Sequence, residues 1–164
     1  MTVFYTIDSA NARVPDVRDL LLRLRDERDE LVRLRDRLLE LERQRSAAAS
    51  SPAVAEPGPV GTVEGDRGPN GRGGAAGPSS AIAAEDRRIQ LRIQGVIDRM
   101  QALVSQIDGW GITLRDIDTG LIDFPALVMG RQIWLCWRLG EGPIDWWHDL
   151  DVGFAGRRRL GDIE

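Results

Sequence analysis

The sequence predicts an α+β fold in which a long antiparallel hairpin of two helices packs on a small antiparallel β-meander of three to four strands. Two long segments on either side of a Gly/Pro-rich stretch repeat apolar residues at steps of three and four, which is typical of coiled-coil-like helices. After about residue 108 apolar residues alternate instead, which is typical of strands. We expect a single domain, 1–164, made of an N-terminal segment with the first long helix (1–49), a disordered insert (50–80), a second long helix (81–108) and a Trp-rich sheet with a C-terminal tail (109–164).

A stripe of apolar side chains indicates the first long helix, which we expect to begin at Pro15. Its members are spaced by three or four residues: Val17, Leu20, Leu24, Leu31, Leu34, Leu38 and Leu41. Only Glu27 interrupts the stripe, and the nine acids and nine arginines of residues 16–45 cancel in charge, as on a solvated helix face. Because Pro15 disfavours helix at the preceding residue, we expect a separate helical turn before it, capped by Thr6 or Asp8.

A second stripe with the same spacing indicates the second helix: Ile82, Ile89, Ile93, Val96, Met100, Leu103 and Ile107. Gly95 lies beside this stripe and is expected to permit close approach of the first helix, since it otherwise costs up to about 1 kcal/mol of helix propensity. Between the helices, residues 50–80 hold eight of the 18 glycines and five of the eight prolines. Their few apolar side chains cannot offset the entropy of ordering, which predicts disorder.

Short segments of alternating polarity predict the sheet. We expect strands at residues 112–115, 121–128, 131–138 and 144–148, joined by turns at 116–120, 129–130 and 140–143. The third segment has Leu135 and Trp137 on one face and Trp134 and Cys136 on the other, which suits a central strand. Pro125 has no N–H to donate, which predicts an edge or a bulge in the second strand.

Charge and hydropathy argue against two classes of partner. The formal net charge is −4, and no segment presents the one-signed basic surface that nucleic acid requires. The one basic cluster, Arg157, Arg158 and Arg159, is interpreted as a solvated tail. No run reaches the roughly 18 apolar residues that span a bilayer, and the first residues lack a secretion signal. We therefore expect no nucleic-acid partner, no membrane partner and a cytoplasmic location.

Four stretches of the chain together resemble a known family. They are YTIDSAN at 5–11, GI followed by DIDTGLIDFP within 111–125, WLCWRLGE at 134–141, and WWH followed by GFAGR within 146–157. In their residues and in their order along the chain, they resemble a bacterial family known as domain of unknown function 2203. The resemblance supports the predicted architecture, marks residues 50–80 as an insertion relative to shorter members, and implies no activity.

The tryptophans are the main functional hint. All five lie between Trp110 and Trp147, and the single histidine, His148, follows directly. One interpretation is a core, because each indole buries about 150–250 Å². The alternative is a ligand pocket with apolar walls and a few polar contacts. Its candidate residues are Trp137, Trp146 and Trp147 for the walls and Arg138, Glu141 and His148 for the polar contacts. Both interpretations can hold on opposite faces of a sheet.

A divalent metal is the cofactor for which the sequence offers ligands. Asp116, Asp118 and Asp123 lie on and just after one turn, where carboxylates suit Mg²⁺ or Ca²⁺, and His148 adds a nitrogen. Alternatively, the turn acids bond their own backbone. One histidine and one cysteine do not form a zinc signature. A nucleophilic pair of Cys136 with His148 across adjacent strands conflicts with the apolar setting, which makes a thiol inert. No catalytic residue is assigned, and whether the chain is an enzyme stays open.

Two functions follow from these observations. The first is a structural or protein-interaction module, whose hairpin pairs with a second copy of the chain or with a helix of another protein. The alternative is a small-molecule or divalent-metal binding domain with an acidic, Trp- and His-containing site on the C-terminal sheet. A concave cluster of polar side chains on the sheet would favour the second function.

Overall fold

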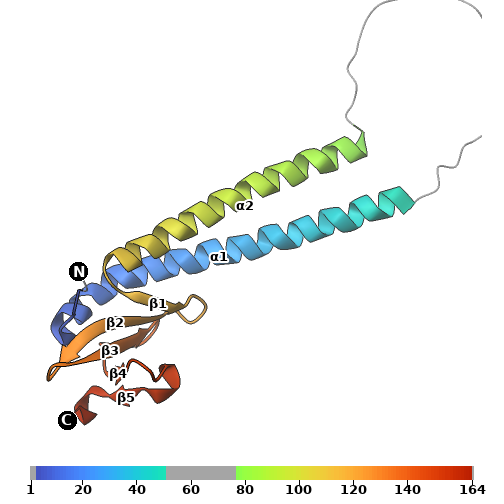
Figure 1. Ribbon diagram of the computed structural model, residues 1–164. Helices are drawn as coiled ribbons and strands as arrows, with labels where there is room; N and C mark the ends of the chain where they lie inside the picture. The colour runs from blue at the N-terminus through green and yellow to red at the C-terminus, as the bar shows by residue number, and fades with distance from the viewer. Residues whose placement is uncertain (1–2, 51–76, 164) are drawn as a thin grey trace, which may run out of the picture. The chain divides into compact units, whose positions relative to one another are not determined.

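Two long helices precede one antiparallel sheet in the computed structural model, which describes residues 3–50 and 77–163 (Figure 1). The helices are α1 (Ile7–Ser50) and α2 (Pro78–Gly109). The predicted α+β class and helical hairpin are therefore confirmed. Most of the predicted insert, residues 51–76, lies outside the described residues.

The chain forms two compact units, and each helix contributes to both. The first unit contains Met1–Val32 and Gln94–Glu164, and therefore includes the whole sheet. The second contains Arg33–Ile93, the remaining parts of the two helices.

Helix α1 begins earlier than predicted and runs through its proline. Thr6 caps it, because the backbone N–H of Ser9 donates to Thr6 Oγ1 at 3.1 Å and the N–H of Thr6 donates to Ser9 Oγ at 2.9 Å. The prediction of a new helix at Pro15 is wrong, since α1 continues past it. A proline inside a helix costs about 3 kcal/mol. Ala10 and Val17 on either side are fully buried in the core, and we attribute the continuity of the helix to this packing.

In the first unit the two helices meet along the predicted stripes. Leu24 of α1 and Val96 and Ile107 of α2 are buried. Glu27, which interrupts the stripe on α1, accepts hydrogen bonds from Nε and Nη2 of Arg99 at 2.7 and 2.9 Å. The interruption is therefore an ion pair between the helices.

Gly95 does not mark a close approach of the helices, so that prediction is wrong. A Cβ added to Gly95 would lie 3.5 Å from Nη1 of Arg99 on the same helix, with no atom of α1 within 4 Å. The side chain of Arg99, which extends across to Glu27 of α1, passes beside Gly95.

The second unit is held by a thinner seam of the same kind. Its buried apolar side chains are Leu34 and Leu41 of α1 and Ile89 of α2. Arg37 pairs with Glu85 at 2.6 Å across the two helices.

The sheet has five strands, one more than the upper bound predicted. They are β1 (Thr113–Asp116), β2 (Leu121–Val128), β3 (Arg131–Arg138), β4 (Trp146–His148) and β5 (Arg158–Arg159), in that spatial order. All neighbours are antiparallel. Met129 and Gly130 join β2 to β3 with φ of 52° and 77°, and a two-residue type I′ hairpin needs such positive values.

Pro125 lies in an inner strand, at a point where that strand has lost one neighbour. β1 pairs only with Leu121–Asp123 of β2. Beyond that point the carbonyl of Pro125 accepts a hydrogen bond from the N–H of Tyr5 at 2.8 Å, and Tyr5 forms an isolated parallel bridge with Ala126. β2 is therefore not an edge strand and that prediction is wrong, but β1 ends before Pro125, so its missing N–H breaks no β1 pairing.

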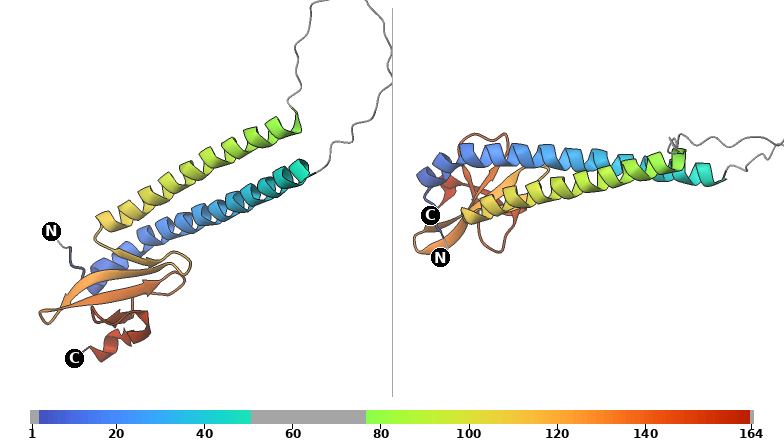
Figure 2. Two further views of the ribbon diagram at one scale, coloured as in Figure 1. Left: turned by 45° about the vertical axis from the view of Figure 1, so that its right-hand side comes forward. Right: turned by 90° about the horizontal axis from the view of Figure 1, so that it is seen from above.

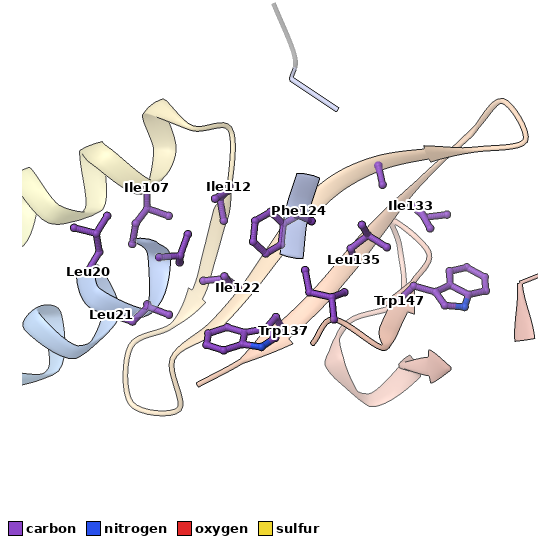
Figure 3. Close-up of a cluster of buried hydrophobic side chains, with 14 residues drawn as sticks. Leu20, Leu21, Ile107, Ile112, Ile122, Phe124, Ile133, Leu135, Trp137 and Trp147 are labelled. Atoms are coloured by element: carbon purple, nitrogen blue, oxygen red, sulfur yellow. The ribbon is translucent and has the colours of Figure 1, made fainter. Parts of the chain in front are cut away.

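One face of the sheet forms the core against the helices. The first part of α1 and the end of α2 lie over this face (Figure 2). The residues that meet there include Leu20, Leu21 and Ile107 of the helices and Ile122, Phe124, Leu135, Trp137 and Trp147 of the sheet (Figure 3). Successive strand residues point to opposite faces, so the residues between these face away from the helices. We call this second side the outer face.

Candidate metal centre

Three neighbouring strands place an aspartate, a cysteine and a histidine together on the outer face. Asp123 of β2 pairs directly with Cys136 of β3, and His148 of β4 pairs with Trp134, two residues before Cys136. Directly paired residues share a face, as do residues two apart, so the three side chains lie on one side. They are 1%, 1% and 3% exposed. We call them the Asp–Cys–His cluster.

The carboxylate of Asp123 is only half satisfied. Its Oδ2 accepts a hydrogen bond from Nε of Arg115 at 2.7 Å and lies 3.2 Å from Nε2 of His148. Its Oδ1 is buried and has no hydrogen-bond partner among the described residues. A buried acceptor without a partner costs about 1–3 kcal/mol, so an oxygen in this state indicates a place for a ligand.

The ring of His148 is oriented by the backbone. Its Nδ1 lies 2.8 Å from the carbonyl oxygen of Asp149, which can only accept, so Nδ1 carries a proton and donates it. The other nitrogen, Nε2, faces Oδ2 of Asp123 at 3.2 Å; a carboxylate also only accepts, so this contact is a hydrogen bond only while Nε2 carries a proton, and a metal bound at Nε2 would take the place of that proton. Metal-binding histidines are commonly fixed in this way, with one nitrogen held by a carbonyl and the other free to coordinate.

Cys136 completes the cluster as a protonated thiol. Burial, reinforced by the negative charge of Asp123, raises the pKa of its thiol to about 12. Such a thiol is a poor nucleophile, and both ring nitrogens of His148 already contact oxygen atoms. The geometry therefore does not support a Cys–His nucleophilic pair. A cation bound beside the sulfur would favour the thiolate instead.

The ligand atoms of the cluster are close enough for one ion. An oxygen of Asp123, the sulfur of Cys136 and a ring nitrogen of His148 all lie within 4.8 Å of one another. Among residues 3–50 and 77–163, no other group of three His, Cys, Asp or Glu side chains meets this condition.

A cavity of about 240 Å³ adjoins the cluster on the outer face. The cluster residues form part of its wall, and the remaining lining residues are Arg115, Leu121, Leu150, Asp151, Gly153 and Phe154. The last four belong to the segment that follows β4, so the C-terminal segment closes one side of the cavity.

One family model covers nearly the whole chain, and this coverage shows the family. A model described as an uncharacterized conserved protein, DUF2203, matches residues 3–160. The chain belongs to the DUF2203 family. This confirms the resemblance seen in the sequence, and the matched range includes the whole Asp–Cys–His cluster. No curated protein and no solved structure matches the chain. Among the helices that the structure describes, none has both the length and the apolar character needed to cross a bilayer.

The DUF2203 chain brings together only part of the metal set predicted from its sequence. Asp123 and His148 meet, whereas Asp116 accepts hydrogen bonds from the N–H groups of Asp118 and Thr119 in its own turn, at 3.3 and 3.1 Å. A further bond from the Thr119 hydroxyl is the main reason why the pKa of Asp116 is lowered. Asp118 pairs with Nε of Arg28 at 2.8 Å. The alternative in which turn acids bond their own backbone thus describes Asp116.

Two tryptophans of the predicted ligand pocket lie in the core. Trp137 and Trp147 are buried on the helix side, where their Nε1–H groups donate to the carbonyls of Gly142 at 2.8 Å and Arg159 at 3.0 Å. Trp146 lies on the other face, between other side chains: the guanidinium carbons of Arg157 and Arg159 are 4.9 and 4.5 Å from its ring centroid. Of the six predicted pocket residues, His148 alone lines the cavity beside the cluster.

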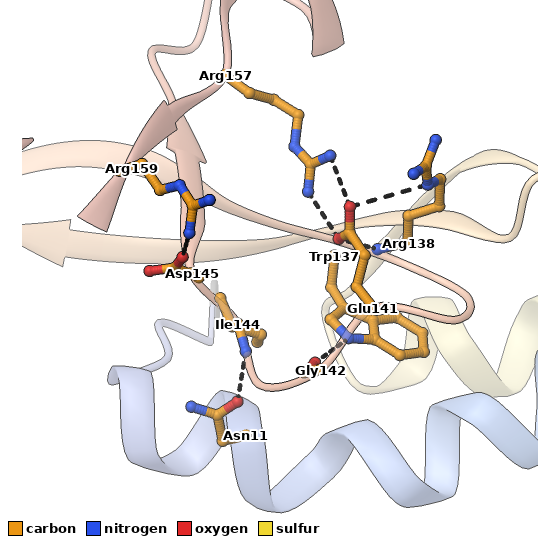
Figure 4. Close-up of polar contacts among 9 residues, drawn as sticks. All are labelled: Asn11, Trp137, Arg138, Glu141, Gly142, Ile144, Asp145, Arg157 and Arg159. Atoms are coloured by element: carbon orange, nitrogen blue, oxygen red, sulfur yellow. Dashed lines mark hydrogen bonds and ion pairs between the residues drawn. The ribbon is translucent and has the colours of Figure 1, made fainter. Parts of the chain in front are cut away.

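Two of the three predicted polar contacts of that pocket, Arg138 and Glu141, belong to an ion-pair network instead (Figure 4). Glu141 accepts hydrogen bonds from both Nη atoms of Arg157, at 2.9 and 2.7 Å, and from the backbone N–H of Arg138 at 3.0 Å. Arg158 and Arg159 pair with Asp149 and Asp145. The interpretation of Arg157–Arg159 as a solvated tail is wrong for Arg157, whose side chain is 9% exposed.

Sequence reasoning missed that Cys136 lies beside Asp123 and His148, and that Arg115 pairs with Asp123. The apolar run around Cys136 predicts an inert buried thiol and gives no sign of its neighbours. The signal that could have found the cluster is positional: Asp123 and Cys136 occupy outer-face positions on strands joined by a two-residue turn at 129–130. Counting outward from that turn pairs them directly.

Proposed function

We propose that this DUF2203 protein binds a transition-metal ion of the Zn²⁺ class through Asp123 Oδ1, Cys136 Sγ and His148 Nε2. The observation that carries the proposal is the buried, partnerless Oδ1 of Asp123 beside a thiol and an oriented imidazole. Arg115, which holds Oδ2 of the same carboxylate, is the kind of second contact that fixes a metal-binding carboxylate.

The ligand types select the metal. A thiolate and an imidazole suit Zn²⁺ and its borderline-soft neighbours, whereas Mg²⁺ and Ca²⁺ prefer sites built of oxygen alone. The proposal therefore moves the metal site away from the turn at Asp116 and Asp118 and changes the expected ion. Three protein ligands leave a fourth position of a tetrahedral ion open.

Cobalt is the direct probe, because Co²⁺ takes the place of Zn²⁺ and reports its own geometry. We expect the metal-free full chain to bind Co²⁺ with the visible absorption of a tetrahedral site and a thiolate-to-metal charge-transfer band, and Zn²⁺ to displace it. Cys136→Ser should abolish the charge-transfer band and weaken binding at least about tenfold, as loss of a ligand does. Asp118→Asn is the matched control and should bind as the unsubstituted protein does.

The proposal fails if the folded protein gives no calorimetric signal with Zn²⁺ or Co²⁺ at millimolar concentration. It also fails if Cys136→Ser, with an unchanged circular dichroism spectrum, binds cobalt with the same affinity and spectrum as the unsubstituted protein.

A second candidate function is the protein-interaction module. It is supported by an open, mainly apolar groove of about 510 Å³ in the first unit, lined by Leu31, Ile97, Met100 and Val104 together with two polar residues. A second copy of the chain or a partner helix would cover this surface. A mass that rises with concentration in light scattering, and falls back in Met100→Glu, would support it; a constant monomer mass without a co-purified partner would count against it.

A further inference from the structure

The cavity beside the Asp–Cys–His cluster is small and mixed in character. Its volume of about 240 Å³ is below the roughly 300–1,000 Å³ of sites for drug-sized ligands, so it fits a molecule of a few non-hydrogen atoms. Leu121, Leu150 and Phe154 supply apolar walls. The charged groups that line it outside the cluster are Arg115 and Asp151.

Arg115 is held by one hydrogen bond through Nε, and its Nη groups keep N–H donors that bond no described residue. Its Nε donates to Asp123 at 2.7 Å, and its guanidinium carbon lies 5.1 Å from the ring centroid of Trp134. The N–H groups on Nη1 and Nη2 have no hydrogen-bond partner in the described part of the chain. A fixed planar guanidinium with free donors matches the oxygen geometry of a carboxylate or a phosphate.

The surrounding charge also favours an anion. One carboxylate and one thiolate would balance a divalent ion, which leaves the positive charges nearby unmatched by the cluster. Arg157 is largely buried and lies close enough to Cys136 and Asp123 for its charge to interact with both, although Glu141 holds its Nη atoms. Asp151 opposes an anion; it is exposed to solvent, as is the 41% exposed side chain of Arg115, so both charges are screened, and Arg115 is distinguished by its fixed contact with Asp123.

We infer that the open position of the metal takes a small oxyanion, a carboxylate or phosphate group, whose second contact is the guanidinium of Arg115. This inference rests on the proposed metal site. One oxygen of the anion would coordinate the ion in place of water, and another would accept hydrogen bonds from Nη1 or Nη2 of Arg115. The apolar walls limit the rest of the ligand to a short chain or to hydrogen.

The test uses the cobalt-loaded full chain titrated with acetate and, separately, with inorganic phosphate, at constant ionic strength set with chloride. We expect a saturable change in the visible cobalt spectrum with at least one of the two anions. Arg115→Lys should lower the affinity for that anion at least about tenfold, because the point charge of an ammonium replaces the planar, two-donor guanidinium. Arg138→Gln is the control, since Arg138 is exposed on the same sheet and does not line the cavity, and it should leave the anion affinity unchanged.

The outcomes separate this inference from the proposed function. If cobalt does not bind, the proposed function fails, and this inference fails with it. If cobalt binds as a tetrahedral site but neither anion alters its spectrum, the oxyanion inference alone is overturned. It is also overturned if Arg138→Gln lowers the anion affinity as much as Arg115→Lys does, because the effect would then be general charge attraction.

A response to phosphate alone assigns a phosphoryl ligand, and a response to acetate alone assigns a carboxylate. Cobalt affinity is measured for each variant, so that loss of the metal is not mistaken for loss of the anion.

Discussion

The guanidinium of Arg157 is largely buried, and its charge is balanced by a single carboxylate, that of Glu141. The Arg157 side chain is 9% exposed, Glu141 accepts from both of its Nη atoms, and its Nε is buried without a hydrogen-bond partner among the described residues. Among the described residues, no second acceptor therefore bonds the guanidinium of Arg157 in place of Glu141. The pair ties β5 and the preceding 3-10 turn to the loop after β3.

Glu141→Gln should therefore destabilise the protein. We expect the free energy of unfolding to fall by about 2 kcal/mol, because a buried charged donor loses its acceptor. Urea denaturation at neutral pH measures this. Glu40→Gln is the control, since Glu40 and its partner Arg43 are both exposed on α1 and such pairs contribute at most about 1 kcal/mol. Equal effects of the two substitutions would contradict the argument.

The same carboxylate predicts a dependence of stability on pH. Burial acts to raise the pKa of Glu141, but the hydrogen bonds from Arg157 and Arg138 and the attraction of both arginines outweigh it, so the pKa is lowered. A lowered pKa in the folded state means that the carboxylate stabilises the fold above its unfolded pKa of about 4.3, and that this contribution is lost as pH falls through the folded value. The stability difference between Glu141→Gln and the unsubstituted protein should therefore shrink in urea titrations below about pH 4. A constant difference would contradict this.

At the level of single residues, the sequence could predict which side chains are polar but not which of them meet. Asp123 and His148 were candidates for a metal site because of their type. That Asp123 lies opposite Cys136, while Asp116 is satisfied within its own turn, depends on strand register and on turn hydrogen bonds. The register follows from the hairpin at 129–130, but the pairing of β4 with β3 joins strands that are separated by an irregular loop, residues 139–145. No local pattern specifies that pairing.

At the level of elements, Gly95 is a weak point of α2 that the structure does not require. A Cβ there would meet only Nη1 of Arg99, at 3.5 Å, which is ordinary van der Waals contact. Gly95→Ala should therefore raise the free energy of unfolding by up to about 1 kcal/mol, through helix propensity. Thermal unfolding monitored by far-ultraviolet circular dichroism measures this change, because that signal reports helix content.

Gly111→Ala is the matched comparison for that substitution. Gly111 has φ of +72°, a conformation that an L side chain adopts only with strain, and a Cβ would lie 3.4 Å from Val3. We expect it to lower stability by about 1 kcal/mol or more. If Gly95→Ala were also destabilising, the helix would need the glycine for a reason other than packing against α1.

The elements themselves were largely predictable where their pattern is long. The boundaries of β2 and β3 coincide with the predicted strands, because glycine-containing turns at 116–120, 129–130 and 140–143 bound both segments. β5 has two residues and no period, so no sequence pattern marks it. Pro15 misled the prediction because local propensity ends a helix there, whereas burial of Ala10 and Val17 against the sheet continues it. Tertiary packing thus outweighed a local signal.

At the level of the whole molecule, the core is confined to one of the two units. Every buried residue of the core cluster belongs to Met1–Val32 or Gln94–Glu164, and so do the Asp–Cys–His cluster and its cavity. Arg33–Ile93 has only a narrow seam of buried leucine and isoleucine side chains. The sequence could not reveal this division, because the same three-four spacing runs through both units. The expectation of one domain over residues 1–164 stays a prediction.

Deleting the second unit tests that expectation. We predict that a variant in which a short Gly/Ser linker joins Val32 to Gln94 folds and keeps the near-ultraviolet circular dichroism of its five tryptophans, all of which lie in the first unit. Its cobalt affinity should equal that of the full chain, because every ligand and its supporting contacts are retained, while replacing a long connection by a short one costs little in loop entropy. Loss of the tryptophan signal would mean that residues 33–93 are needed for the first unit to fold, and the chain would then be a single cooperative domain, as its sequence suggests.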